Sequence, residues 1–196
     1  TGVVALVNWL VVRDDPRERG FQSYMSAAAP SARPQSVLGG IRAVLRTRNV
    51  WLIFIISGGV TGPTLTFAGL WGVPFLRTHY GLTTANAAMI TSALLLAWAA
   101  AGPMLGAMSD RIGSRRPLYG LGAALAAAGW FMVFLVPDLP PVLLIAILVV
   151  TGIASGCIMI GFAYAKESTP VALAGTTSGV INMGNMLGGM IMQPAV

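Results

Sequence analysis

The stretch Gly106-Ala-Met-Ser-Asp-Arg-Ile-Gly-Ser-Arg-Arg-Pro117 is a short basic turn between two long apolar runs. One run covers residues 85–108 and the other covers residues 117–136. Each run has about the 20 mainly apolar residues that a helix needs to cross a bilayer. Three arginines and an aspartate between two such runs predict that the chain leaves the membrane here and enters it again.

Two further complete runs, at residues 50–76 and 141–165, have the same length and character. Of the 196 residues, 56% are apolar and 9% are charged, and the mean hydropathy is +0.77. Such a composition is typical of a chain embedded in lipid rather than of a soluble domain. Backbone polar groups in lipid must be paired internally, and the runs do not alternate as barrel strands do. We therefore predict an all-α, polytopic membrane helix bundle.

The ends of the sequence and the segment between them set the expected organisation. Residues 1–12 are expected to be the end of a spanning helix, and a last helix, with Thr169 as N-cap and Pro170 at N1, is expected to be cut at residue 196. Residues 13–49 carry a charged run and an Ala-, Ser- and Pro-rich stretch that favours a linker. Residues 50–196 form the predicted transmembrane domain.

Within this linker, residues 37–48 have an amphipathic pattern. Leu38, Ile41, Val44 and Leu45 share one helical face with Val37, and arginines fall elsewhere. This predicts a helix lying at the membrane surface. The alternative is a helix packed on protein.

The basic residues predict the orientation. Eleven of the twelve Lys and Arg residues lie on alternate loops, including Arg13, Arg42, Arg115 and Lys166, and only Arg77 lies on the opposite side. Cytoplasmic loops carry the excess of Lys and Arg, so we expect that majority side to be cytoplasmic. His79 and Asp138 should then face outward.

The basic turn resembles the signature loop of the major facilitator superfamily. The matching residues are Gly106, Asp110, Arg111, Gly113, Arg115 and Arg116. Plain anchoring by positive charge would explain the last two arginines but neither the aspartate nor the glycines. A weaker resemblance to the junction of helices ten and eleven lies at Glu167-Ser-Thr-Pro170, followed by Gly175, Gly179 and Asn182.

The resemblance implies a twelve-helix fold of which this chain is the carboxy-terminal half. The chain would run from the end of helix six into helix eleven, with residues 13–49 as the cytoplasmic central linker. Asp110 is expected to hold the outward-facing state closed on the inside. It would act through Arg111 or Arg115 and a helix N-terminus of the amino-terminal half.

The resemblance also implies that helices seven and ten line a central cavity, that eight and eleven flank it, and that nine faces lipid. Polar and aromatic side chains at helical spacing are candidates to line it: Ser57, Thr61, Thr64, Trp71, Thr151, Ser155, Asn182 and Asn185. The alternative is hydrogen bonding between helices without solute contact. Run 117–136 has few polar residues, and its Phe131 and Val133 are expected to matter less for transport.

The chemistry that is absent from the sequence limits the function. No Asp, Glu, Lys, Arg or His lies in the middle of the complete runs. There is no phosphate-binding loop, nucleophile elbow, metal-spaced His pair or basic and aromatic nucleic-acid patch, and Cys157 is a lone cysteine. We expect no cofactor, no metal, no enzyme active site and no nucleic-acid partner.

The predicted function is secondary-active transport of a small solute by alternating access, in the cell (inner) membrane. The expected partners are that solute, the lipid bilayer and the amino-terminal half of the same chain. The alternative is a transport-inactive sensor or scaffold of the same fold. An integral membrane enzyme is a second rival, which the lack of an intramembrane acid, base or metal cluster disfavours.

Overall fold

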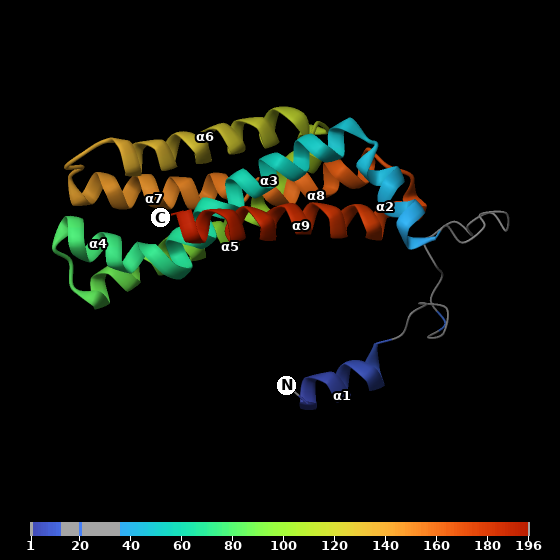
Figure 1. Ribbon diagram of the computed structural model, residues 1–196, viewed down its shortest axis with the longest axis horizontal. Helices are drawn as coiled ribbons and strands as arrows, with labels where there is room; N and C mark the ends of the chain where they lie inside the picture. Colours follow the sequence, from blue (N-terminus) through green and yellow to red (C-terminus); the bar gives the residue numbers. More distant parts are fainter. Residues whose placement is uncertain (1, 13–19, 21–35, 196) are drawn as a thin grey trace. The chain divides into compact units, whose positions relative to one another are not determined.

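The computed structural model describes residues 2–12, 20 and 36–195 and has two units, Thr1–Gln35 and Ser36–Val196. In the first unit, α1 (Gly2–Val11) is a short helix of mainly apolar residues, none of which is buried. Most of the predicted linker, including Arg13, lies outside the described residues. The larger unit carries all the features discussed below (Figure 1).

The second unit is built from helices, and its described residues include no strand. After α2 (Val37–Leu45) the elements are α3 (Arg48–Thr66), the π-helical turn η2 (Phe67–Trp71), α4 (Gly72–Tyr80), α5 (Thr84–Ile112), α6 (Arg116–Leu135), α7 (Pro141–Ser155), α8 (Ile158–Glu167), the 3-10 turn η3 (Val171–Leu173), α9 (Ala174–Met192) and the 3-10 turn η4 (Gln193–Ala195). The all-α bundle is confirmed.

Among the described residues, four helical stretches are long and apolar enough to cross a membrane: Arg48–Tyr80, Thr84–Ile112, Arg116–Leu135 and Pro141–Glu167. They coincide with the four complete apolar runs. The first and second stretches extend several residues beyond the predicted bounds, because polar residues continue the helices past the apolar part. The fourth stretch also differs from the prediction of one unbroken helix, because it is interrupted between α7 and α8.

The turns follow local backbone chemistry. Gly113, with φ of +69°, ends α5 in the left-handed conformation that glycine adopts without a steric cost, and Pro117 lies in the first turn of α6. The expected N-cap at Thr169 is wrong. The 3-10 turn η3 precedes α9, and the Thr169 hydroxyl instead lies 2.9 Å from that of Thr177 on α9.

Helix α3 packs against α9, and α7 packs between α5 and α6 (Figure 1). The α3–α9 pair is in backbone contact, because a Cβ built on Gly188 would lie 2.2 Å from the Gly58 carbonyl oxygen. Glycines four residues apart permit this approach in membrane helices. The seam fixes α9 on the face of α3 that carries Thr61.

The amphipathic helix α2 packs on α9 and α3. Its Ser36 N-cap hydroxyl accepts from Gly39 N–H at 3.1 Å, and Val44 is fully buried. Leu38 is 79% exposed, so it does not share the packed face as its spacing suggested. Contact of α2 with the membrane surface stays a prediction.

Candidate functional site

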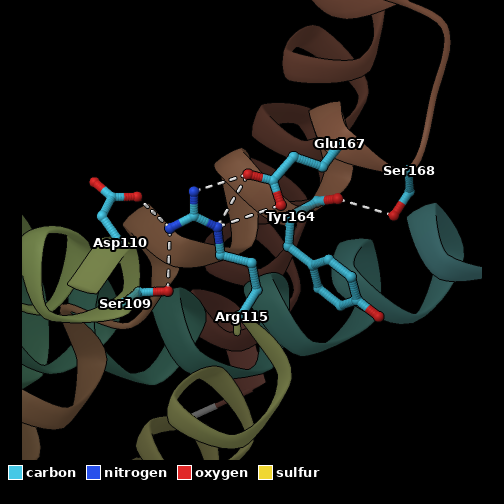
Figure 2. A network of polar contacts seen from close by, with 6 residues as sticks. All are labelled: Ser109, Asp110, Arg115, Tyr164, Glu167 and Ser168. Atoms are coloured by element: carbon cyan, nitrogen blue, oxygen red, sulfur yellow. Dashed lines mark hydrogen bonds and ion pairs between the residues drawn. The ribbon is translucent and has the colours of Figure 1, made fainter. Parts of the chain in front are cut away.

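Arg115 is the centre of a polar cluster at one end of the bundle (Figure 2). The turn at Gly113 reverses the chain after α5 and places Arg115, the N-cap of α6, beside the last turn of α5. Its Nη1 donates to Asp110 Oδ1 and, at 3.2 Å, to Ser109 Oγ. The guanidinium group therefore joins the two helices that the basic turn connects.

The same guanidinium group binds Glu167, the last residue of α8. Nη2 and Nε donate to Glu167 Oε1 at 2.8 and 3.0 Å, and Nε also lies 3.3 Å from Oε2. We call Ser109, Asp110, Arg115 and Glu167 the Arg115 cluster. Through one planar guanidinium group, which suits paired recognition of carboxylates, it joins the ends of α5, α6 and α8.

The cluster is open to solution yet electrostatically complementary. The Arg115 side chain is 20% exposed, and those of Asp110 and Glu167 are 66% and 52% exposed. Hydrogen bonds to Glu167 first, and to Asp110 second, raise the pKa of Arg115. A raised arginine pKa keeps the group cationic throughout the physiological range, so Arg115 does not itself titrate there. Two carboxylates against one guanidinium leave the cluster with a net negative charge.

Sequence reasoning anticipated part of this arrangement. Of the two proposed partners for Asp110, Arg115 is in contact with it. The other, Arg111, is exposed and forms no ion pair among the described residues, and the same holds for Arg116. Glu167 was missed as a partner. No local signal would have found it, because Glu167 lies 52 residues beyond Arg115 in the chain. Gly106 faces open space in this half, with no described atom within 4 Å of a built Cβ.

A second set of polar contacts lies next to Glu167 and stabilises the same end of the bundle. Ser168 Oγ donates to the Tyr164 carbonyl oxygen at 2.8 Å (Figure 2) and accepts from Asn49 Nδ2 of α3 at 3.4 Å. The contact between Thr169 and Thr177 adds α9. Glu167 therefore lies in a junction that is tied to α3 and α9 as well as to Arg115.

Most of the proposed cavity residues lie inside the bundle. At least 95% of each is buried: Ser57, Thr61, Thr64, Thr151, Ser155 and Asn185. Five of them lie against polar groups of other helices: Thr61 Oγ1 donates to Asn185 Oδ1 at 3.3 Å, Thr64 Oγ1 lies 3.3 Å from Ser155 Oγ, and Ser57 Oγ lies 3.4 Å from Tyr119 Oη. Thr151 Oγ1 instead donates to the Ile147 carbonyl oxygen of its own helix at 2.7 Å. For all six, contact with a solute stays a prediction.

Two members of the set are accessible. Trp71 is partly exposed on the π-helical turn, and its Nε1 donates to the Gln193 carbonyl oxygen at 3.1 Å; Asn182 is exposed on α9. Phe131 and Val133 on α6, the two residues expected to matter less for transport, differ in exposure. Phe131 is 64% exposed, whereas Val133 is 2% exposed and belongs to the core. Only Phe131 therefore suits the role of a surface control.

The described residues contain no group of three or more His, Cys, Asp or Glu side chains that could hold a metal ion. What they offer to a solute is hydroxyl, amide, indole and apolar surface, with charge gathered at the helix ends.

The chain is similar in sequence to known proteins. The model of the family described as Major Facilitator Superfamily matches residues 1–192. Two relatives, from Mycobacterium tuberculosis strains CDC 1551 / Oshkosh and ATCC 25618 / H37Rv, are each named "Probable nitrate/nitrite transporter NarK2". Each is 30% identical over 196 residues, covering 96% of this chain and 44% of the relative. The chain therefore spans about half the length of the curated relatives it matches. No solved structure matches it.

Proposed function

This chain belongs to the Major Facilitator Superfamily and is part of a multi-pass membrane protein, and from that premise we propose that the whole protein carries a small solute across the membrane by alternating access. In such transporters two helical halves rock around a site near the middle of the bilayer. The amino-terminal half of the same protein would supply the second wall of that site. The sensor or scaffold alternative has no observation in its favour.

The observation that carries the proposal is the Arg115 cluster. Rocking requires that each half moves as a unit, and the cluster joins the ends of three helices through one side chain. Asp110 is also 66% exposed, so its carboxylate can meet a further partner. We infer that it binds a helix N-terminus of the amino-terminal half when the cytoplasmic side is closed.

The expected size of this gate is set by simple electrostatics. A carboxylate at a helix N-terminus contributes about 0.3 to 1 kcal/mol, or about 2 when partly buried. A hydrogen bond to a charged group contributes about 1.5 to 3 kcal/mol. Because about 1.4 kcal/mol corresponds to a tenfold change in population, losing about 2 kcal/mol from the closed state shifts the equilibrium about thirtyfold toward the inward-facing state.

The solute to test first is a small oxyanion, because both relatives are named as probable nitrate/nitrite transporters. The middle of the complete spanning runs in this chain lacks Lys, Arg and His. A cation that balances the charge of an anion would therefore come from the rest of the protein. Trp71 and Asn182 would provide the contacts that this half makes with the solute.

The test is nitrate and nitrite counterflow in vesicles containing the full-length protein. We expect counterflow by the native protein and a slower rate in Asp110→Asn, which keeps the shape of the side chain and removes its charge. Asp138→Asn is the matched control, because Asp138 is an exposed aspartate in the turn between α6 and α7. Absence of counterflow by the native protein would reject the solute, and a native rate in Asp110→Asn would reject the gate.

A further inference from the structure

The span Pro141–Glu167 is broken near its middle, between α7 and α8. Gly156 N–H and Cys157 N–H donate to the carbonyl oxygens three residues earlier, at 3.0 and 3.1 Å. Met159 N–H, which a regular α-helix would direct to the Ser155 carbonyl oxygen, donates instead to that of Gly156 at 3.2 Å. The break therefore turns the Ser155 carbonyl oxygen away from its regular donor.

A side chain of the neighbouring helix supplies a donor. Trp98, near the middle of α5, donates from Nε1 to the Ser155 carbonyl oxygen at 3.2 Å. In lipid a backbone carbonyl group without a donor costs several kcal/mol, so this bond matters more than one at the surface. The Ser155 hydroxyl donates to the Thr151 carbonyl oxygen at 2.7 Å and lies 3.3 Å from the Thr64 hydroxyl of α3.

The α5 backbone lies directly against the break. A Cβ built on Gly156 would lie 2.7 Å from Ala101 Cβ and 2.9 Å from Gly102 N. A groove of about 730 Å³ lies along α5, and Trp98, Gly102, Pro103 and Asp110 of α5 line it together with Met159 of α8. The ring of Trp98 is thus partly exposed to the groove while its N–H is held by the break.

We propose that Trp98 is a positioning residue for transport, acting as a latch that holds the α7–α8 break in its observed geometry. The helix α8 begins at this latch and ends at Glu167 in the Arg115 cluster. This ten-residue helix is therefore held by contacts at both ends, so a displacement beside the groove is transmitted to the charged end of the bundle. This inference rests on the proposed transport function for its consequence, but the latch itself is testable without transport.

The native Cys157 is the reporter. It lies at the break, is fully buried, and is the only cysteine of this chain. Its side chain packs against Gly122 of α6. In full-length protein whose remaining cysteines are replaced, a membrane-permeant maleimide therefore reaches Cys157 only when the segment at the break moves away from α6. Trp98→Phe removes the indole N–H and should increase the labelling rate about tenfold, the effect of losing about 1.4 kcal/mol from the closed form.

Trp51→Phe is the matched control, because the Trp51 indole also donates to a backbone carbonyl group, that of Leu45, at a site remote from the break. It should leave Cys157 labelling unchanged. A second reporter, Ala87→Cys, replaces a fully buried residue of the same α5 and detects general loosening. Should Trp98→Phe fail to reach the membrane, 3-benzothienylalanine at position 98 keeps the bicyclic shape and lacks the N–H.

The outcomes separate the latch from the proposed function. Equal Cys157 labelling in the Trp98→Phe and Trp51→Phe variants, or an equal rise at position 87, would overturn the latch. With the latch present, Trp98→Phe should lower the maximal rate of nitrate counterflow more than it changes the half-saturating concentration. An unchanged maximal rate would overturn the positioning role. Absence of nitrate counterflow in the native protein would reject nitrate as the solute, and labelling would still decide the latch.

Discussion

Single side chains in this half divide into those that hold helices together and those left accessible. Ser57, Thr61 and Thr64 belong to the first kind, because their hydroxyl groups contact other helices inside the bundle. Trp71 and Asn182 belong to the second kind. A solute that passes between the two halves of the protein can contact only accessible groups, so the second kind carries the prediction for solute binding.

We expect Trp71→Ala and Asn182→Ala to reduce nitrate counterflow while the amount of protein in the membrane stays normal. Phe131→Ala is the comparison, since Phe131 is a large exposed side chain on α6. Loss of aromatic or amide contact should raise the half-saturating solute concentration, by about tenfold for each 1.4 kcal/mol removed. Equal losses in all three variants would show that the two positions serve packing.

At the level of helices, the seam between α3 and α9 brings two helix backbones into direct contact. Apolar surface gives little drive for association between helices in lipid, so close van der Waals packing and interhelical hydrogen bonds stabilise the pair. Here the seam combines both, because the Gly58–Gly188 contact lies beside the hydrogen bond from Thr61 to Asn185. A single methyl group in the seam would separate the backbones.

Gly188→Ala should destabilise the full-length protein by about 1 to 3 kcal/mol, the usual cost of overpacking, because the added Cβ meets backbone rather than a flexible side chain. Gly175→Ala is the matched variant in the first turn of α9, where a built Cβ has no described atom within 4 Å. Thermal unfolding in detergent measures both. A similar melting temperature for the two variants would mean that the seam is absent from the full-length protein.

Several elements could be predicted from the sequence because length and apolar composition determine whether a helix can cross lipid. The break between α7 and α8 could not, since it results from hydrogen bonds shifted by one residue within a run that is apolar on both sides. The role of the hydroxyl stripe on α3 was also ambiguous. The same spacing serves a cavity wall and an interhelical contact, and only the position of α9, α7 and α6 around α3 distinguishes them.

In the candidate site, the residues of one turn were predictable and their distant partner was not. Asp110 and Arg115 are five residues apart, and a tight turn between two spans brings them together. Glu167 lies 52 residues beyond Arg115 in the chain. Its approach depends on how α8 packs beside α5 and α6, which the local pattern does not specify.

For the molecule as a whole, the basic residues predict which ends of the helices face the cytoplasm. The Arg115 cluster and Arg42 of α2 belong to the predicted basic-rich side, and His79 and Asp138 belong to the other. Because helices such as α5 and α6 alternate in direction across the tight turn at Gly113, we predict that these groups lie on opposite sides of the bilayer.

A cysteine at position 79 of the full-length protein should react with an impermeant thiol reagent on intact cells. Cysteines at positions 42 and 166 should react only after the cells are opened, because positive charge retains their segments on the cytoplasmic side. Labelling at 42 or 166 without labelling at 79 in intact cells would reverse the orientation. This measurement requires no transport activity.

Because the Arg115 cluster is exposed, the strength of its ion pairs depends on the salt concentration of the surrounding solution. At an ionic strength of about 0.15 M the screening length is about 8 Å, and at about 1 M it is about 3 Å, close to the separations of 2.8 and 3.0 Å within the cluster. A cell that accumulates salt under osmotic stress would therefore weaken this contact from within.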